Sequence, residues 1–394
     1  MADPEKLAET EDSEGGFSDF SDSELLLADL PDTEPAPPAA AAAPASSLQR
    51  QRRLKGIIES TSTVQNDEPK QHEDSGDDVD GTLQKKRKPD DQSPLKKYNL
   101  KYLCVTDLCS QSWCEQKMVY GFELPDVQQL DAVPVITAGS SIHLARELEV
   151  HDIVSVSTTT REDSWAVKCL NLLSMIPVLQ AGGRVREFPV FGEVEGIFMV
   201  GVVDELHYTA KGELELNELK TRGNPSLPGE SQKKSHYFQV CVYKLMFDAM
   251  VRGKINSENL LSHLSLRSNQ SLGPQVQTHA QKAGFSVSTF GDLLELTCLN
   301  LTFSDLPAID SLKIEYCHQE NNTALGVEIV DFKEENVREQ LQYYISYWKG
   351  QRELRGVDIE DAWKCRTCCF SDICEWRTKK AEETSQRFLS KRGK

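Results

Sequence analysis

Four cysteines are placed so that their thiolates could hold an inorganic centre. Cys365, Cys368 and Cys374 share one short segment, and Cys114 lies 251 residues upstream of the first of them. Three thiolates leave a four-thiolate site one ligand short, so Cys114 is the candidate fourth ligand. A zinc ribbon would normally offer two Cys-x-x-Cys pairs, and only one is present here. The spacing favours a [4Fe–4S] cluster that ties together the two ends of a domain. The alternative is a buried thiol at Cys114 with a local zinc knuckle.

A second group combines two carboxylates with an ammonium. Asp204 ends an apolar run, and Glu218 and Lys220 lie two residues apart in the next run, so they would project from the same face of a strand. A hairpin that turns at Lys211-Gly212 would bring Asp204 beside them. Carboxylates of this kind suit Mg²⁺ or Mn²⁺, which activates water, while the lysine stabilises developing charge. For an isolated Glu-x-Lys pattern, an ordinary surface salt bridge is the alternative.

The elements that must position these residues indicate an α/β fold with a mixed sheet flanked by helices. A strand or turn at 101–104 precedes a helix for which Thr106 or Asp107 is the expected N-cap. The remaining hydrophobic patterns predict helices at 138–150, 162–179, 231–251 and 334–349, and strands at 185–193, 197–208, 213–221, 312–318 and 324–332.

Composition divides the chain into three parts. The predicted parts are a disordered acidic tail at 1–97, a folded domain at 98–378 and a flexible C-terminal tail at 379–394. Residues 1–92 contain 22 acidic and 10 basic residues, a net charge of −12 out of −18 for the whole chain, and they have few aromatic residues.

Localisation follows from the same tail and from the cysteines. A basic cluster at 85–88 suggests nuclear import, with the cytoplasm as a second location. The acidic N-terminus argues against secretion and against mitochondrial import. The sequence offers no membrane-spanning stretch. Eleven unevenly spaced cysteines suit a reducing compartment.

Several motifs occur together in an order that resembles one nuclease family. A helical histidine (His143), an aspartate (Asp204), the Glu218-Leu219-Lys220 triplet and a Gln-x-x-x-Tyr pattern at 239–243 follow the order of the RecB-like branch of the PD-(D/E)XK nucleases. Some of those nucleases clamp their domain with one upstream cysteine and a downstream trio. Segments such as GVVDELHYTAKGELEL further resemble the exonuclease V family, and the resemblance covers about residues 98–378.

The resemblance implies a role for each residue. His143, Asp204 and Glu218 would bind Mg²⁺ (or Mn²⁺), and Lys220 would be the catalytic lysine. Gln239 and Tyr243 would share one helix face and reach the same phosphate or base. Glu187 would support the site. The iron–sulfur ligands would be Cys114, Cys365, Cys368 and Cys374.

The resemblance also implies an activity. It predicts a Mg²⁺-dependent exonuclease in DNA repair that degrades single-stranded DNA from a free end and releases short oligonucleotides. The expected state is a monomer, and a single-strand-binding protein is a candidate partner. Expected DNA contacts are Arg222, Lys233, Lys234 and Tyr237. The competing hypothesis is an inert iron–sulfur or zinc protein that binds DNA or acts as an adaptor.

Overall fold

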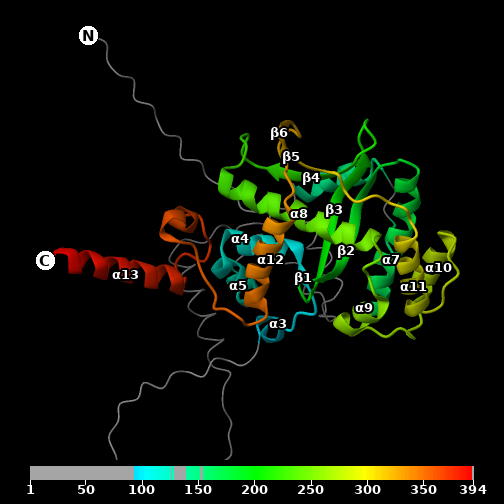
Figure 1. Ribbon diagram of the computed structural model, residues 1–394, viewed down its shortest axis with the longest axis horizontal. Helices are drawn as coiled ribbons and strands as arrows, with labels where there is room; N and C mark the ends of the chain where they lie inside the picture. The colour runs from blue at the N-terminus through cyan, green and yellow to red at the C-terminus, as the bar shows by residue number, and fades with distance from the viewer. Residues whose placement is uncertain (1–92, 126, 128–138, 151–153, 393–394) are drawn as a thin grey trace, which may run out of the picture. The chain divides into compact units, whose positions relative to one another are not determined.

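A six-stranded mixed β-sheet forms the centre of the fold (Figure 1). This computed structural model describes residues 93–125, 127, 139–150 and 154–392. The predicted basic cluster at 85–88, with the acidic tail before it, lies outside these residues. The strands are β1 (Leu103–Cys104), β2 (Val185–Val194), β3 (Ile197–Tyr208), β4 (Leu214–Arg222), β5 (Ser311–His318) and β6 (Ala324–Ile329).

Strand β3 organises the sheet because its two edges carry different partners. Along one edge it pairs antiparallel with β2 from Ile197 to Leu206. The other edge is shared, with β1 pairing in parallel at Met199 and Val200 and β4 pairing antiparallel from Glu205 to Tyr208. The sheet then continues from β4 to a parallel β5 and an antiparallel β6. Asp204 therefore lies on β3 between the residues that pair with β1 and those that pair with β4.

Helices flank this sheet, and the long helix α8 lies across it (Figure 1). A capping box between Thr160 and Asp163 starts α7. The aromatic residue Trp165 of α7 is fully buried and packs edge-on against Phe191 and Phe198 of the sheet. The helices with assigned bounds are α3 (Pro94–Lys97), α4 (Val105–Trp113), α5 (Glu115–Glu123), α7 (Arg161–Gln180), α8 (Glu230–Val251), α9 (Ser257–Leu264), α10 (Pro274–Lys282), α11 (Phe290–Thr302), α12 (Glu334–Trp348), the 3-10 helix η1 (Ile359–Cys365) and α13 (Glu375–Arg392).

Glycine allows α8 to approach β3 closely. A β-carbon placed on Gly201 would come within 2.6 Å of Cε1 of Tyr243 and 3.0 Å of Cγ2 of Val105. The absence of a side chain at Gly201 thus lets the Tyr243 ring lie directly on the strand, three residues before Asp204. This close packing sets how near α8 comes to the shared edge of β3.

The structure confirms the predicted α/β class and mixed sheet, and it corrects several details. All five predicted strands are present, and the predicted helix at 138–150 appears as a helix at 139–147 followed by a turn. The N-cap of α4 is Cys104, so Thr106 and Asp107 fall inside its first turn. Helices α9, α10 and α11 were not predicted. No described helix is long and apolar enough to cross a membrane.

Helices also lie beyond both predicted ends of the folded domain. Helix α3 lies before residue 98, and its Leu95 packs against the core. At the other end, α13 continues to Arg392 where a flexible tail from residue 379 was predicted.

Candidate active site

The β3–β4 hairpin brings the two predicted carboxylates together. The last antiparallel pair joins Glu205 to Asn217, and Asp204 and Glu218 are the next residues beyond that pair, one on each strand. Past this point the backbone N–H of Leu219 donates to Oδ2 of Asp204 at 2.7 Å. Both carboxylates are buried. The hairpin predicted from the turn at 211–212 is confirmed, and it places Asp204 and Glu218 on adjacent strands, each one residue beyond the last backbone pair.

Lys220 is held by a buried chain of polar groups. Its ammonium donates to Oε1 of Glu218 at 3.1 Å and to Oε1 of Gln239 at 2.7 Å. The amide nitrogen of Gln239 in turn donates to the hydroxyl of Tyr243 at 3.0 Å. Gln239 and Tyr243 do share one face of α8, as predicted. Tyr243 is fully buried, however, so in this structure it supports Gln239 and does not present its hydroxyl to solvent.

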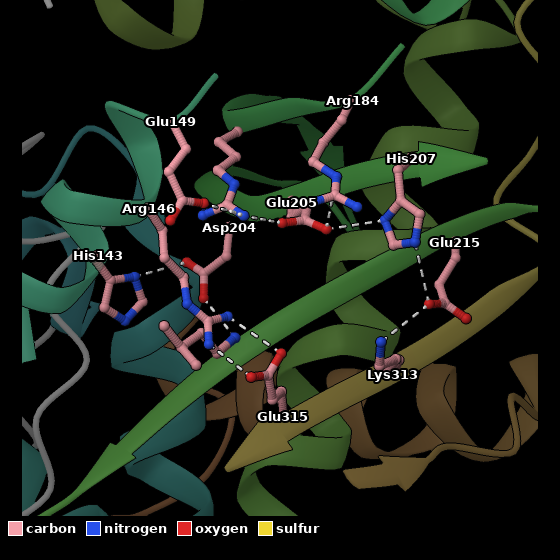
Figure 2. A network of polar contacts seen from close by, with 12 residues as sticks. His143, Arg146, Glu149, Arg184, Asp204, Glu205, His207, Glu215, Lys313 and Glu315 are labelled. Atoms are coloured by element: carbon pink, nitrogen blue, oxygen red, sulfur yellow. Dashed lines mark hydrogen bonds and ion pairs between the residues drawn. The ribbon is translucent and has the colours of Figure 1, made fainter. Parts of the chain in front are cut away.

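A candidate metal site lies at Oδ1 of Asp204, the carboxylate oxygen that Leu219 does not contact. One ligating atom each from His143, Glu187 and Asp204 lie within 4.8 Å of one another. Nδ1 of His143 is 3.6 Å from Oδ1 of Asp204 (Figure 2). Glu187 has a φ of +53°, in the left-handed region that is costly for a residue with a side chain. Such strain is typical of residues whose position serves function. The two carboxylates are donors that suit Mg²⁺ or Mn²⁺, and the imidazole offers a third, softer ligand.

These residues line a cavity that opens beside the sheet. Two arginines, Arg146 and Arg186, also line it. The lining consists of His143, Arg146, Arg186, Glu187, Asp204, Glu205, Asn217 and Leu219. Of the three predicted Mg²⁺ ligands, His143 and Asp204 are in this lining. The third, Glu218, is almost fully buried and makes its ion pair with Lys220.

Ion pairs set the charge around the cavity (Figure 2). Arg186 lies 2.8 Å from Oε2 of Glu205, and His207 lies 3.1 Å from Oε1 of the same carboxylate. Burial alone would raise the pKa of Glu205, but the contact with His207 and the charge of Arg186 outweigh it and lower that pKa. The hydrogen bond from Arg146 likewise lowers the pKa of Glu315. Both acids therefore stay ionised, and they counterbalance the arginines that line the cavity.

The four predicted cluster cysteines lie close enough to influence one another. Burial raises the pKa of the Cys114 thiol to about 11, and the neighbouring thiols of Cys368 and Cys365 add to the shift. Burial, Cys368 and Cys374 raise the pKa of Cys365. A hydrogen bond with Cys369 is the main cause that lowers the pKa of Cys368 to about 6, where the thiolate that metals bind predominates at neutral pH.

Contacts around these cysteines join the two ends of the domain. Trp113 packs edge-on against Trp363 with ring centroids 5.6 Å apart. Glu115 pairs with Arg352, and its Oε2 also accepts from the backbone N–H of Arg355 at 3.0 Å. Aromatic and ionic contacts thus join the segment around Cys114 to residues 352–363, which directly precede the three C-terminal cysteines.

The predicted DNA contacts do not gather at the cavity. Arg222 donates to Gln232 at 3.0 Å, and Lys233 and Tyr237 both donate to Glu328 of β6, at 2.8 and 3.1 Å. Lys234 is exposed. None of these four lines the cavity around Asp204.

Sequence reasoning gave Glu187 only a supporting role and missed the two arginines. Arg146 lies three residues after His143, which places both on one face of the helix. Arg186 directly precedes Glu187. The helical spacing was a usable signal for Arg146, whereas the position of Arg186 depends on how β2 pairs with β3.

Comparison with known proteins decides the family. The profile of a family described as "Exonuclease V - a 5' deoxyribonuclease" matches residues 93–217, 210–289 and 287–377. The chain belongs to the exonuclease V family. A curated Exonuclease V of Danio rerio is 50% identical over 310 residues, which is 78% of this chain and 79% of that protein. The resemblance to the exonuclease V family is therefore confirmed.

Two weaker similarities extend beyond the exonuclease V relatives. An uncharacterized protein, ORF95, of Ostreid herpesvirus 1 (isolate France) is 26% identical over 129 residues, 30% of this chain and 42% of that protein. A solved structure titled "Crystal structure of SSO0001" is 13% identical and aligns with a TM-score of 0.35 over 84% of this chain and 97% of that one. Neither similarity adds to the assignment within the exonuclease V family.

Proposed function

We propose that this chain is a Mg²⁺- or Mn²⁺-dependent exonuclease that hydrolyses single-stranded DNA from a free end and acts in DNA repair. The observation that carries the proposal is the meeting of His143, Glu187 and Asp204 at one cavity. Lys220 is held by Glu218 on the strand next to that of Asp204. Membership of a family described as 5′ deoxyribonucleases supports the reaction class and favours the 5′ end.

The metal ligands in this proposal are His143, Asp204 and Glu218, and we add Glu187. Their carboxylate oxygens are the hard donors that Mg²⁺ and Mn²⁺ prefer, and the imidazole of His143 adds a softer nitrogen donor. When bound, the ion would neutralise charge on the scissile phosphate and lower the pKa of a water molecule. The hydrogen bond from Leu219 N–H to Asp204 fixes one carboxylate oxygen, which leaves the other directed toward His143.

Lys220 performs the remaining chemistry of the site. Glu218 and Gln239 hold its ammonium from two directions, so that it enters the reaction already oriented. A fixed cation beside the scissile phosphate stabilises the negative charge that develops in the transition state. Tyr243 positions Gln239 from behind. In this proposal the chain of contacts runs from Tyr243 in the core through Gln239 to Lys220, which faces the reacting phosphate.

The four cysteines would hold a [4Fe–4S] cluster with a structural role. The mutual influence of their thiols and the surrounding aromatic and ionic contacts support this assignment. Because the ligands come from both ends of the domain, the free energy of binding the cluster would contribute to folding. A zinc centre on the same thiolates is the alternative, and iron analysis separates the two.

The remaining parts of the proposal concern partners. Arg222 and Lys234 remain predicted DNA contacts, as do Lys233 and Tyr237 once Glu328 releases them. We propose that the protein acts as a monomer in the nucleus, with single-stranded DNA as substrate and a single-strand-binding protein as partner. The oligomeric state is measured directly by light scattering with and without DNA.

A nuclease assay on linear single-stranded, duplex and circular single-stranded DNA tests the function. Asp204→Ala and Lys220→Ala should each reduce the rate on linear single strands by about 10²-fold or more, because each removes charge at the reaction centre. Lys211→Ala, in an exposed turn, is the matched control and should keep wild-type activity. Circular single strands should resist the enzyme because they lack an end. Wild-type rates from either site variant would refute the assignment. A wild-type protein that binds DNA without cleaving it, in Mg²⁺ or Mn²⁺, would favour the inert-binder hypothesis.

A further inference from the structure

The helix that carries His143 shows no apolar attachment to the part of the core that the structure describes. Among the described residues, none of the apolar side chains at 139–150 belongs to the hydrophobic core or packs against it. Leu144 and Leu148, which lie one turn apart, are 48% and 54% exposed. Most surface helices are held by an apolar face, so within the described residues the contacts that attach this helix are of another kind.

Ion pairs attach this helix to the sheet instead (Figure 2). Arg146 makes a two-pronged contact with Glu315 of β5, at 2.6 Å between Nη2 and Oε1 and 3.2 Å between Nη1 and Oε2. The two side chains are only 21% and 20% exposed. A second pair joins Arg186 to Glu149 at 3.5 Å, but Glu149 is 66% exposed. Solvent screens exposed pairs strongly, so the Arg146–Glu315 pair is the stronger attachment.

Both members of the Arg146–Glu315 pair are connected to residues of the candidate metal site. Glu315 lies opposite Leu219 in the β4–β5 register, and Leu219 is the residue whose N–H donates to Asp204. Arg146 follows His143 by three residues on one face of the helix. An arginine fixed to Glu315 therefore fixes the imidazole that meets Asp204 at 3.6 Å.

We propose that Arg146 and Glu315 are positioning residues, and that their ion pair holds the His143 helix so that the imidazole meets Asp204. The inference rests on the proposed metal site and adds the element that assembles it. The pair acts through His143. Groups that orient a metal ligand in this way typically contribute about 10- to 100-fold to metal affinity.

A double-mutant cycle on the full-length protein tests this, with Mn²⁺ alone as the probe. By calorimetric titration, Arg146→Ala and Glu315→Gln should each weaken Mn²⁺ binding about tenfold. Arg146→Lys should weaken Mn²⁺ binding less than Arg146→Ala, since an ammonium can keep one ion pair with Glu315 although it cannot reproduce the two-pronged contact. In a His143→Ala background, Arg146→Ala should change the affinity by less than about twofold, because coupled residues are not additive. A full tenfold further loss there would overturn the proposal and indicate that Arg146 acts on the site directly.

Hydrogen exchange provides a readout that needs neither metal nor DNA. Amides at 139–150 should exchange about tenfold faster in Arg146→Ala, while those of β3 and β4 stay unchanged. Arg338→Ala is the matched control. Arg338 pairs with Glu334 at 2.8 Å and with Glu195 at 3.3 Å, and neither partner is on the His143 helix, so this variant should alter neither Mn²⁺ affinity nor exchange at 139–150. Unchanged exchange at 139–150 in Arg146→Ala would overturn the proposal. If the wild type does not bind Mn²⁺, the proposed metal site is wrong. The hydrogen-exchange result would then still show whether the Arg146–Glu315 pair holds the helix.

Discussion

Removing the side chain of Gln239 should separate catalysis from folding at this site. Gln239 is almost fully buried and connects Lys220, at 2.7 Å, to Tyr243, at 3.0 Å. In Gln239→Ala the ammonium loses this acceptor and keeps its contact with Glu218. We therefore expect Lys220 to stay in place but to lose its fixed orientation.

The magnitude follows from the kind of hydrogen bond that is removed. A hydrogen bond to a charged group contributes about 1.5–3 kcal/mol. If that contribution is expressed fully in the transition state, the rate falls by about 10- to 100-fold, since about 1.4 kcal/mol corresponds to a factor of ten. Tyr243→Phe removes only the far end of the chain and leaves the Lys220–Gln239 contact, so its effect on the rate should be smaller than tenfold.

Single-turnover cleavage of end-labelled single-stranded DNA, with excess enzyme and Mg²⁺, measures these rates. Thermal unfolding of the same preparations shows whether each variant is folded. A folded Gln239→Ala that cleaves within twofold of the wild-type rate would show that orientation of Lys220 by Gln239 plays no part in catalysis. A Tyr243→Phe variant slower than Gln239→Ala would also contradict the proposed order of contacts.

Three further perturbations test other parts of the structure. Gly201→Ala should destabilise the protein by about 1–3 kcal/mol, seen as a lower unfolding temperature, because the new methyl group would overlap the Tyr243 ring. Cys368→Ala should lose iron and the visible absorption band near 400 nm, and should fold poorly or lose activity. Burial raises the pKa of Asp107 to about 6, against about 3.9 in an unfolded chain. Between these pH values the folded state binds more protons, so stability falls as pH rises. Asp107→Asn should remove that fall and gain about 1–3 kcal/mol at pH 8, with little change at pH 4, by thermal melts.

Each of these has a control and a result that would contradict it. A β-carbon at Gly223 would lie no closer than 3.6 Å to another atom, so Gly223→Ala should unfold at the wild-type temperature. An equal fall in unfolding temperature in both glycine variants would exclude the proposed overlap with Tyr243. The Cys369→Ser variant should keep its iron, because Cys369 is not an assigned ligand. If Cys369→Ser were colourless and Cys368→Ala kept its iron, Cys369 would replace Cys368 as the cluster ligand. An unchanged pH dependence in Asp107→Asn would show that Asp107 titrates normally.

Local patterns predicted most of the elements that build the site. Alternation and turn residues were enough for the β3–β4 hairpin, and that hairpin brings Asp204 beside Glu218. The four-residue spacing of Gln239 and Tyr243 was enough to place them on one face of α8. Segments such as GVVDELHYTAKGELEL were enough to identify the exonuclease V family, which the profile match confirms.

Features that depend on pairing between distant segments were not visible in the sequence. Glu187 meets His143 and Asp204 only because β2 pairs with β3 and because its own backbone adopts a positive φ. Arg146 lies 169 residues before Glu315, so neither residue identifies the other. The predicted contacts Lys233 and Tyr237 were assigned from local charge and aromaticity, and only the fold shows that Glu328 binds both.

We propose that His143, Glu187 and Asp204, whose ligating atoms lie within 4.8 Å of one another, surround one divalent ion. A crystal of the full-length protein soaked in Mn²⁺, with anomalous diffraction measured at the manganese edge, tests it directly. We expect one strong anomalous peak between the His143 imidazole and the Asp204 carboxylate, and no peak there in Asp204→Asn. A peak elsewhere, or none at saturating Mn²⁺ in an active preparation, would contradict the proposed site.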